Sequence, residues 1–409
     1  MLFLESYSLT LPWGVDMESE LELIDGELSM EGLELHERLL DESFEAVVRL
    51  LDTHDALSHL VMAQPSMTEA EYQQAATQLY GIAIKGTDIS LESLDTSFEA
   101  TNRGLIDIAK AIGKAIAEFF KRFLNWMSEI DIMTSVLKRR AFMLQRAAIA
   151  ARGKSPSEPF VQLNRLHRWL RRGHSYVRDS IRMEHELKVL LNVCQVAFGD
   201  LPNDILRALD RMPTVQAQPN KKQACVDIVE AIPFTRLASR LKMVPVPRER
   251  FMRDGVFATP PLMGGRSVFL FQSNLAEKGT VGLRFHGFQY ADSITEQFTY
   301  ASSREFDTLG PLDIVKMPEI LIEILTAVSR ASNSTTISKV KQAKSVAENL
   351  SNRISLDESL SAGDRDYIRK TISALMFWTT NVTRPLGNDA ISVCKAVLHY
   401  CHSSLKVQR

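Results

Sequence analysis

The chain has 409 residues, of which 45% are hydrophobic and 24% are charged. This composition excludes a globally disordered chain, and the length allows two or three domains with cores of their own. The net charge of −2 hides a division at about residue 92. Residues 1–92 hold 19 acidic and 3 basic side chains and are near −16, whereas residues 93–409 hold 31 acidic and 45 basic ones and are near +14. Only the second part would attract a polyanion.

Targeting and disulfide signals are missing from the sequence. The four cysteines, Cys194, Cys225, Cys394 and Cys401, are too few and too scattered for a disulfide scaffold and fit a reducing compartment. Glu5 lies where a secretion signal would be positively charged. No run of apolar residues approaches the length of a membrane span, so we expect neither a secretion signal nor a transmembrane helix.

The acidic segment contains helical patterns. Apolar residues at helical spacing predict a helix between residues 35 and 60, with Pro65 at its end or in a turn after it. A shorter helix is expected from residue 68 to about 80, with Ser66 or Thr68 as its N-cap.

Residues 104–150 have the pattern of one long basic amphipathic helix. Its apolar stripe consists of Leu105, Ile108, Ile112, Ile116, Phe119, Phe120, Phe123 and Met127. Most such stripes pack into a protein core, but a basic helix of this kind can also lie on a membrane or on a partner.

A basic stretch follows a break at residues 153–159. We expect helix again from Phe160 to about Phe198, with arginines at near-helical spacing. The candidate phosphate contacts are Arg165, Arg168, Arg171, Arg172, Arg178 and Arg182. An arginine fork binds phosphate oxygens well, although these side chains could instead form a solvated face or pair with carboxylates. No base-reading motif accompanies them, so contact with DNA would be non-specific.

The rest of the chain predicts short elements and then long helices. Residues 202–261 suggest short helices joined by loops, and the next segments have strand character: residues 267–271, 280–285 and 297–300, with turn signals at Gly264–Gly265 and Lys278–Gly279. Helices are expected again from about Pro318, then over about 336–354, 364–382 and 388–405. The fold class is therefore mainly α (α+β), with a small antiparallel sheet or hairpin near residues 266–300.

Catalytic and metal-binding motifs are not evident. The sequence lacks a phosphate-binding loop, a nucleophile elbow and a zinc-protease motif. The one Cys/His cluster is Cys394, His399, Cys401 and His402. One helix cannot easily wrap four ligands around a metal, so buried cysteines explain the cluster better. We expect no catalytic residue, cofactor or metal.

The charge boundary has the character of a processing site. It contains Ser90-Leu91-Glu92 followed by Ser93, in a polar, glycine-containing stretch of the kind in which proteolysis concentrates. Other Ser-x-Glu tripeptides begin at Ser29, Ser43 and Ser97. The acidic segment could alternatively be a helical domain that stays docked on the basic part.

With these features the chain resembles the internal head (inner-body) proteins of giant phiKZ-like tailed bacteriophages. The resemblance is carried by the acidic N-terminal segment, the Ser-x-Glu junction, and Ser93-Leu94-Asp95 leading into residues 112–120, IGKAIAEFF. It implies that a prohead protease cleaves after Glu92, with Ser90, Leu91 and Glu92 recognised. It further implies that the processed protein is packaged with the genome inside the capsid, and it offers no catalytic residue.

These observations lead to a structural virion protein as the first hypothesis. Its parts would be an acidic propeptide-like segment (1–92), a basic helical region (93–200) and a helical domain with the small β element (201–409). Its partners would be the prohead protease, packaged double-stranded DNA, other capsid-internal proteins and possibly further copies of itself.

Two alternatives come from other classes of protein. The first is a membrane-acting or ejected virion protein that uses helix 104–127. The second is a hydrolase or transferase that uses the polar set near the strands, namely Arg284, His286, Tyr290 and Asp292.

Overall fold

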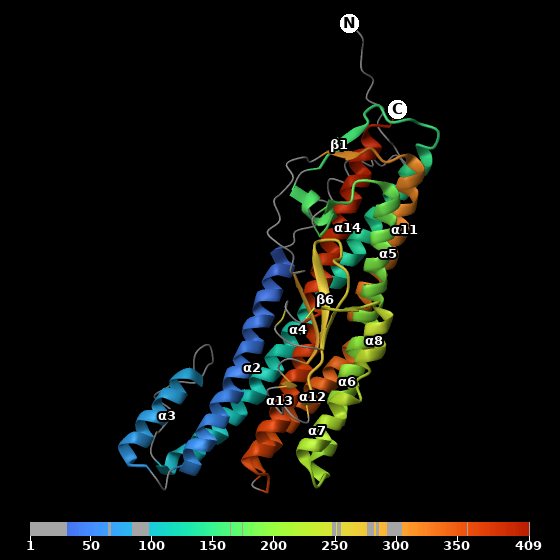
Figure 1. Ribbon diagram of the computed structural model, residues 1–409. Helices are drawn as coiled ribbons and strands as arrows, with labels where there is room; N and C mark the ends of the chain where they lie inside the picture. Colours follow the sequence, from blue (N-terminus) through green and yellow to red (C-terminus); the bar gives the residue numbers. More distant parts are fainter. Residues whose placement is uncertain are drawn as a thin grey trace.

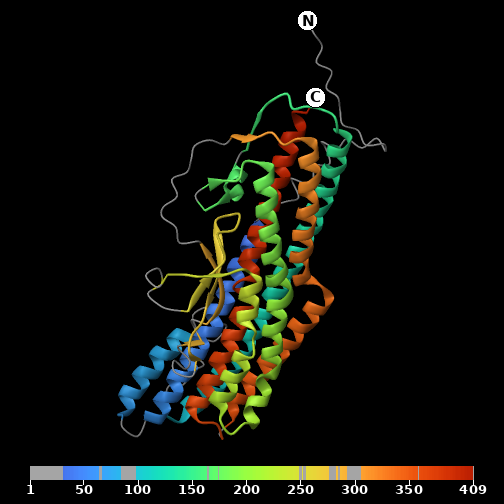
Figure 2. The ribbon, with the colours of Figure 1, turned by 45° about the vertical axis from the view of Figure 1, so that its right-hand side comes forward.

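Long helices lie side by side along most of the molecule, and a small sheet lies against one side of them (Figures 1 and 2). The computed structural model describes residues 31–63, 67–83, 98–163, 165–173, 175–247, 251, 255–275, 282–283, 286–292, 305–357 and 359–408. The mainly α fold with a small antiparallel β component is the one that the sequence predicts.

The elements have the following bounds. The helices are α2 (Glu31–Ala63), α3 (Glu69–Ala83), α4 (Phe98–Ala150), α5 (Ser180–Gln195), α6 (Leu201–Arg211), α7 (Lys221–Glu230), α8 (Phe234–Arg240), α11 (Pro311–Val328), α12 (Ser334–Leu356), α13 (Ala362–Thr380) and α14 (Thr383–Lys406). Shorter helical turns are η3 (Arg165–Leu170), η4 (Val196–Asp200), η5 (Met212–Ala217) and η6 (Ser329–Ser332). The strands are β1 (Phe160–Gln162), β2 (Arg171–Arg172), β3 (Ser175–Tyr176), β4 (Val244–Pro245), β5 (Val256–Ala258), β6 (Arg266–Phe271), β7 (Gly287–Asp292) and β8 (Glu305–Asp307).

Helix α4 is the element against which the other long helices pack. Its 53 residues make it about 80 Å long, and α2, α11, α12 and α14 all contact it. The predicted stripe lies in the core: from Ile108 to Met127 its side chains are at most 4% exposed, and Trp126 beside them is fully buried. The residues that would have formed a membrane-binding edge therefore pack against protein. No helix among the described residues combines the length and apolarity needed to span a bilayer.

The N-terminal helices form where the sequence predicts them. Thr68 caps α3, because its backbone N–H donates to Glu71 at 3.0 Å while its hydroxyl lies 3.4 Å from the backbone nitrogen of Glu71. Ser66 lies outside the described residues.

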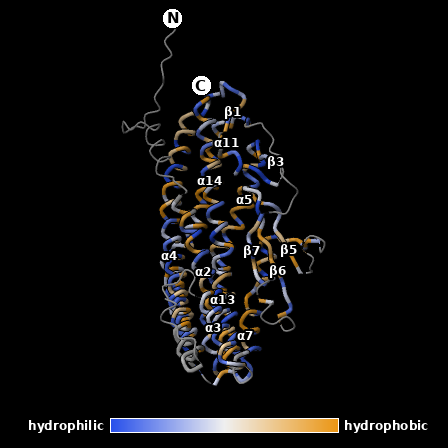
Figure 3. The backbone as a smooth tube through the Cα atoms, turned by 90° about the vertical axis from the view of Figure 1, so that its left-hand side faces the viewer, coloured by the Kyte–Doolittle hydropathy of each residue, from blue (hydrophilic) through white to orange (hydrophobic). Residues whose placement is uncertain are grey.

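Polar and apolar residues alternate along each long helix, as Figure 3 shows, so each buries one side and exposes the other.

The sheet has the strand order β4-β5-β6-β7, with antiparallel neighbours throughout. Both faces of β6 are covered: Val268 and Leu270 join the main core, whereas Phe269 and Phe271 form a small separate cluster with Phe251. The strand predicted at 267–271 is thus confirmed, as is the turn at Gly264–Gly265, where both residues have positive φ.

The strand predicted at residues 280–285 is wrong at residues 282 and 283, the part of it that the structure describes. These two residues are helical, and Leu283 is buried in the main core. The partner of β6 is β7, which begins at Gly287 opposite Phe271. A short apolar run fits a buried helical turn as well as a strand, so its pattern could not separate the two. The predicted turn at 278–279 and strand at 297–300 lie outside the described residues.

The helix predicted from Phe160 is also wrong over residues 160–179. This part consists of β1 paired with β8, the turn η3 and the hairpin β2–β3, which turns at Gly173 with a φ of 54°. Asp179 is the N-cap of α5 and accepts from the Arg182 backbone N–H at 2.7 Å. Helix therefore begins only at Ser180, because the preceding backbone is paired with other strands.

The C-terminal helices agree with the predictions apart from two starts, and one of these is that of α14, which begins at Thr383 and not at about 388. Helix α11 begins at Pro311, not near Pro318, which lies buried inside the helix. Proline suits the first helical position because its missing N–H would have no partner there.

The four cysteines are buried and free. Burial raises the pKa of Cys225 and that of Cys401 to about 12, so these thiols are inert core residues.

A side chain at Gly387 is expected to disrupt the contact between α4 and α14. A Cβ there would lie 3.2 Å from Trp126 and 3.3 Å from Phe198. We expect Gly387→Val to lower the free energy of unfolding by about 1–3 kcal/mol through overpacking. Gly363→Ala in α13, where a Cβ meets no atom within 4 Å, should be neutral or stabilise by up to about 1 kcal/mol. Chemical denaturation measures both, and equal destabilisation would contradict the packing argument.

Candidate functional site: the surface that holds the acidic helix

Helix α2, which belongs to the acidic segment, lies against α4, α13 and α14. We call the residues of these three helices that contact it the α2-binding surface: Ile116, Phe119, Arg122, Arg369, Met376, Phe377, Arg384 and Asn388. This surface combines an apolar centre with arginines, so it complements an amphipathic helix that carries carboxylates.

The apolar side of α2 is buried against these three helices and against α3. Side chains that are at most 5% exposed recur along the helix at Leu33, Leu40, Val47, Leu50, Leu51 and Leu57. Phe44 stacks on Phe377 with 5.2 Å between ring centroids and tilts against Phe119 at 5.8 Å. Burying a side chain of this size contributes roughly 1.5–3 kcal/mol before the cost of ordering it, so α2 is part of the protein core.

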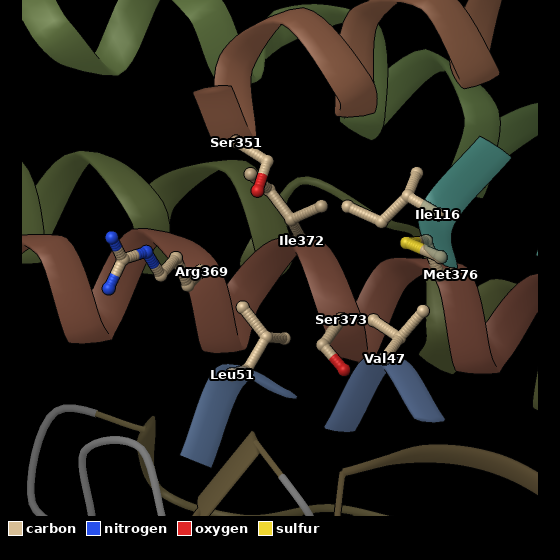
Figure 4. Close-up of a pocket in the computed structure, with 8 residues that line it drawn as sticks. All are labelled: Val47, Leu51, Ile116, Ser351, Arg369, Ile372, Ser373 and Met376. Atoms are coloured by element: carbon tan, nitrogen blue, oxygen red, sulfur yellow. The ribbon is translucent and has the colours of Figure 1, made fainter. Parts of the chain in front are cut away.

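Figure 4 shows one junction within this surface. It is lined by Val47 and Leu51 of α2, Ile116 of α4, Ser351 of α12, and Arg369, Ile372, Ser373 and Met376 of α13. The space that these residues line has no room for a water molecule. This junction is a packing interface between α2 and the body, and it does not form a ligand pocket.

A buried cation stands at one end of the α2-binding surface. Arg369 is 1% exposed, and its Nη1 donates to Asp55 Oδ1 at 3.0 Å and to His54 Nδ1 at 2.8 Å. Burial, followed by the charge of Arg369, lowers the pKa of His54 to about 3. The imidazole is therefore neutral, and its unprotonated nitrogen can accept a hydrogen bond from the guanidinium group.

The same surroundings change the pKa of the Asp55 carboxyl. Burial, with the neighbouring Asp366 carboxyl, raises the pKa of Asp55, although the charge of Arg369 acts in the opposite direction. Asp55 thus holds a proton more tightly than an isolated carboxyl does and can share it with Asp366. Two residues of α2 and two of α13 form one hydrogen-bonded group, which fixes the register of the two helices.

A second arginine holds the N-terminal half of α2. Arg384 Nη1 donates to Asp41 Oδ1 at 2.5 Å and to the Glu37 backbone oxygen at 3.2 Å. Glu37 also accepts from Asn388 Nδ2 at 2.8 Å, and Arg122 donates to the Leu39 carbonyl. Since Glu37 and Asp55 are 18 positions apart, the two clamps lie about 27 Å from each other along the helix.

Sequence reasoning missed these clamp residues. The available signal was the pair His54-Asp55 within an apolar helical stripe, together with Arg369 in the apolar pattern of the helix predicted at 364–382. A charge on a buried face needs a partner, so each of these residues predicted a contact. No pattern within a single sequence could have indicated which two helices meet.

The six arginines predicted to contact phosphate do not share a helix face. Only Arg182 lies on α5; its Nη2 donates to Ser175 Oγ at 2.8 Å. Arg172 pairs with the buried Glu186, and its Nε donates to the Pro261 carbonyl at 3.3 Å.

The other arginines of this set lie in η3, in β2 and in the loop before α5. The side chain of Arg171 donates to the Gly264 carbonyl at 3.4 Å, and that of Arg168 lies over the Trp169 ring at 5.2 Å. Arg168 and Arg182 are exposed, and Arg178 is half-buried. The structure gives the backbone position of Arg165 and describes no contact of its side chain.

A second group of arginines surrounds a cavity of about 250 Å³ between α6, α7 and α8. Arg207 and Arg236 lie 3.2 and 3.7 Å from the carboxylate of Asp204, and Arg211 also lines the cavity. Three guanidinium groups outnumber one carboxylate here, so this wall is positively charged. The sequence reading, which concentrated on residues 165–182, did not single it out.

The polar residues near the strands do not form a catalytic arrangement in the described part of the chain. His286 packs between Phe234 and Trp378, and its Nδ1 accepts from the Ser273 backbone N–H at 3.2 Å. Tyr290 donates to Asp389 at 2.9 Å. Arg284 lies outside the described residues. Within those residues, no group of His, Cys, Asp or Glu is placed to hold a metal ion.

The processing motif Ser90, Leu91, Glu92 and Ser93 lies outside the described residues. Another Ser-x-Glu tripeptide, Ser43-Phe44-Glu45, lies within α2. The Ser43 hydroxyl is buried and donates to the Leu40 carbonyl at 2.8 Å.

The fold and its charged surfaces are those of a helical structural protein. The sequence profile of the phiKZ-like phage internal head proteins matches residues 18–403. The chain therefore belongs to the family of phiKZ-like phage internal head proteins, and it is a virion protein located inside the capsid. No curated protein and no solved structure matches it.

Replacing the buried arginine tests the clamp on α2. Arg369→Met keeps the length of the side chain but removes the donor to His54 and Asp55, and we expect the free energy of unfolding to fall by about 1–3 kcal/mol because buried acceptors lose their partner. The matched control is Arg38→Met. It breaks an exposed pair with Glu42 whose atoms are 3.9 Å apart, and should cost less than about 1 kcal/mol. Urea denaturation compares the two variants, and similar losses would contradict the buried clamp.

Proposed function

We propose that this internal head protein is processed by the prohead protease after Glu92 and that its basic part makes non-specific contacts with packaged DNA. The observation that carries the proposal is the charge division: residues 1–92 are near −16 and residues 93–409 near +14. Two arginines of the basic part, Arg369 and Arg384, are paired with carboxylates of the acidic helix. While α2 is bound, these arginines are not available to phosphate.

Two exposed regions support DNA contact by the basic part. One contains Arg168, Arg178 and Arg182, and the other contains the arginines that surround the cavity between α6 and α8. Both regions lack an element shaped to enter a DNA groove and read bases, which fits contact with the phosphate backbone alone. Other capsid-internal proteins and further copies of this chain are the remaining proposed partners, and the role is structural, not enzymatic.

Peptide mass spectrometry of the protein from mature particles tests the processing. We expect a peptide that begins at Ser93 and no peptide that spans the Glu92–Ser93 bond. Glu92→Ala in the phage should keep this bond intact, because it removes the recognised carboxylate. Glu99→Ala changes the neighbouring Ser-x-Glu tripeptide and should be processed normally. Peptides that span the Glu92–Ser93 bond in mature particles, with no terminus at Ser93, would reject the proposed cleavage.

Salt dependence tests the DNA contact. Binding of the full chain to duplex DNA should weaken as the salt concentration rises, because phosphate contacts release counterions. Removing two contacts in Arg168→Ala/Arg182→Ala should reduce the slope of log K against log salt by about 1.8. Arg38→Ala, on the exposed side of α2, should leave the slope unchanged. An unchanged slope in the double variant would exclude these two arginines as phosphate contacts.

A further inference from the structure

The contacts that hold α2 are separate from the segment in which the chain would be cut. The apolar contacts of α2 with the body involve Phe44, Val47 and Leu51, and the two arginine clamps bind Glu37, Asp41 and Asp55. Helix α2 ends at Ala63, well before Glu92. Hydrolysis of the peptide bond after Glu92 would therefore leave each of these contacts in place.

A cut changes the effective concentration of the helix. In the intact chain the linker holds α2 near its binding surface, at an effective concentration on the order of millimolar for a short flexible linker. After the cut, binding depends on the free concentration of the N-terminal fragment. The fragment separates only if its intrinsic affinity is weak, and the buried stripe and the two clamps argue for a strong one.

We propose that α2 stays bound to the body after cleavage as a non-covalent subunit, and that the positive charge of the body is uncovered only when α2 is displaced. The importance of this step for the phage rests on the proposed cleavage, whereas the retention of α2 rests on the contacts alone. Cleavage and the change of charge are then separate events. The nicked protein keeps the net charge of the whole chain until the second event occurs.

The internal Ser-x-Glu tripeptide gives an independent reporter of this state. Ser43 is 5% exposed, and Phe44 lies between Phe119 and Phe377 in the docked helix. A protease needs an extended, accessible substrate, so bound α2 should resist cleavage after Glu45. Displaced α2 should be cut there readily.

The retention test uses the full chain with a site-specific protease sequence in place of residues 86–91. After complete cutting, the mixture is run on a size-exclusion column at micromolar concentration and neutral pH, and each peak is analysed by mass spectrometry. We expect both fragments in one peak, and separation only in denaturant. An N-terminal fragment that elutes alone from the nicked wild-type chain would overturn the proposal.

A matched pair of variants on α2 separates specific docking from simple association. Val47 is 1% exposed and faces the body, whereas Leu35, on the same helix, is 44% exposed. Val47→Asp should increase the dissociated fraction of the nicked protein at least about tenfold, because it places a charge in an apolar contact. Leu35→Asp introduces the same charge at an exposed position and should co-elute like the wild type. Equal release from both variants would overturn the assignment of the surface.

Two further measurements keep the result interpretable. Circular dichroism of the uncut variants verifies that each is folded; if Val47→Asp is not, Leu51→Ala takes its place with the same expectation. A glutamate-specific protease should produce a peptide ending at Glu45 from nicked Val47→Asp but not from nicked wild type. If mature particles lack a terminus at Ser93, the proposed cleavage fails, while co-elution of the engineered fragments still decides whether α2 is retained.

Discussion

The apolar side of α4 is the constraint on which the rest of this structure depends. A helix about 80 Å long with a continuous stripe of large side chains must bury that stripe along its whole length. Helices α2, α11, α12 and α14 together supply the cover. The acidic helix α2 covers part of this stripe, and its removal would expose Phe119, which packs against Phe44 of α2.

Ion pairs fix the position of α2 along α4. Apolar contact alone would tolerate a shift of α2 along α4 by one helical turn, because leucines and valines at helical spacing are nearly equivalent. The pairing of Asp55 with Arg369, and of Glu37 and Asp41 with Arg384, fixes one register. Breaking one partner of such a pair is costly, since the other charge is then buried without compensation.

For an internal head protein this arrangement gives the acidic helix two roles. The helix completes the core, and it occupies arginines that lie on the basic part of the chain. A structural role of this kind needs surfaces and charge rather than a catalytic group. It also explains why the polar residues near the sheet, such as His286 and Tyr290, are satisfied within the fold and packed among aromatic rings.

The sequence by itself determined the elements that depend on local periodicity. The long helix through residues 104–150, the strand at 267–271 and the C-terminal helices all follow from patterns within a few turns of chain. The division of charge and the family resemblance are also properties of the linear sequence, and the family match over residues 18–403 confirms the resemblance.

The tertiary structure alone decided the pairings. The arginines at 165–182 looked like a helix face because their spacing is nearly helical, but the β2–β3 hairpin and the bridge between Arg172 and Met263 interrupt the helix there. Arg172 pairs with the buried Glu186, and Arg369 pairs with Asp55, which lies more than 300 positions away in the sequence. Helix packing determines these contacts. A charged side chain that is excluded from water must pair with a group that the fold places beside it, and that group can come from any part of the chain.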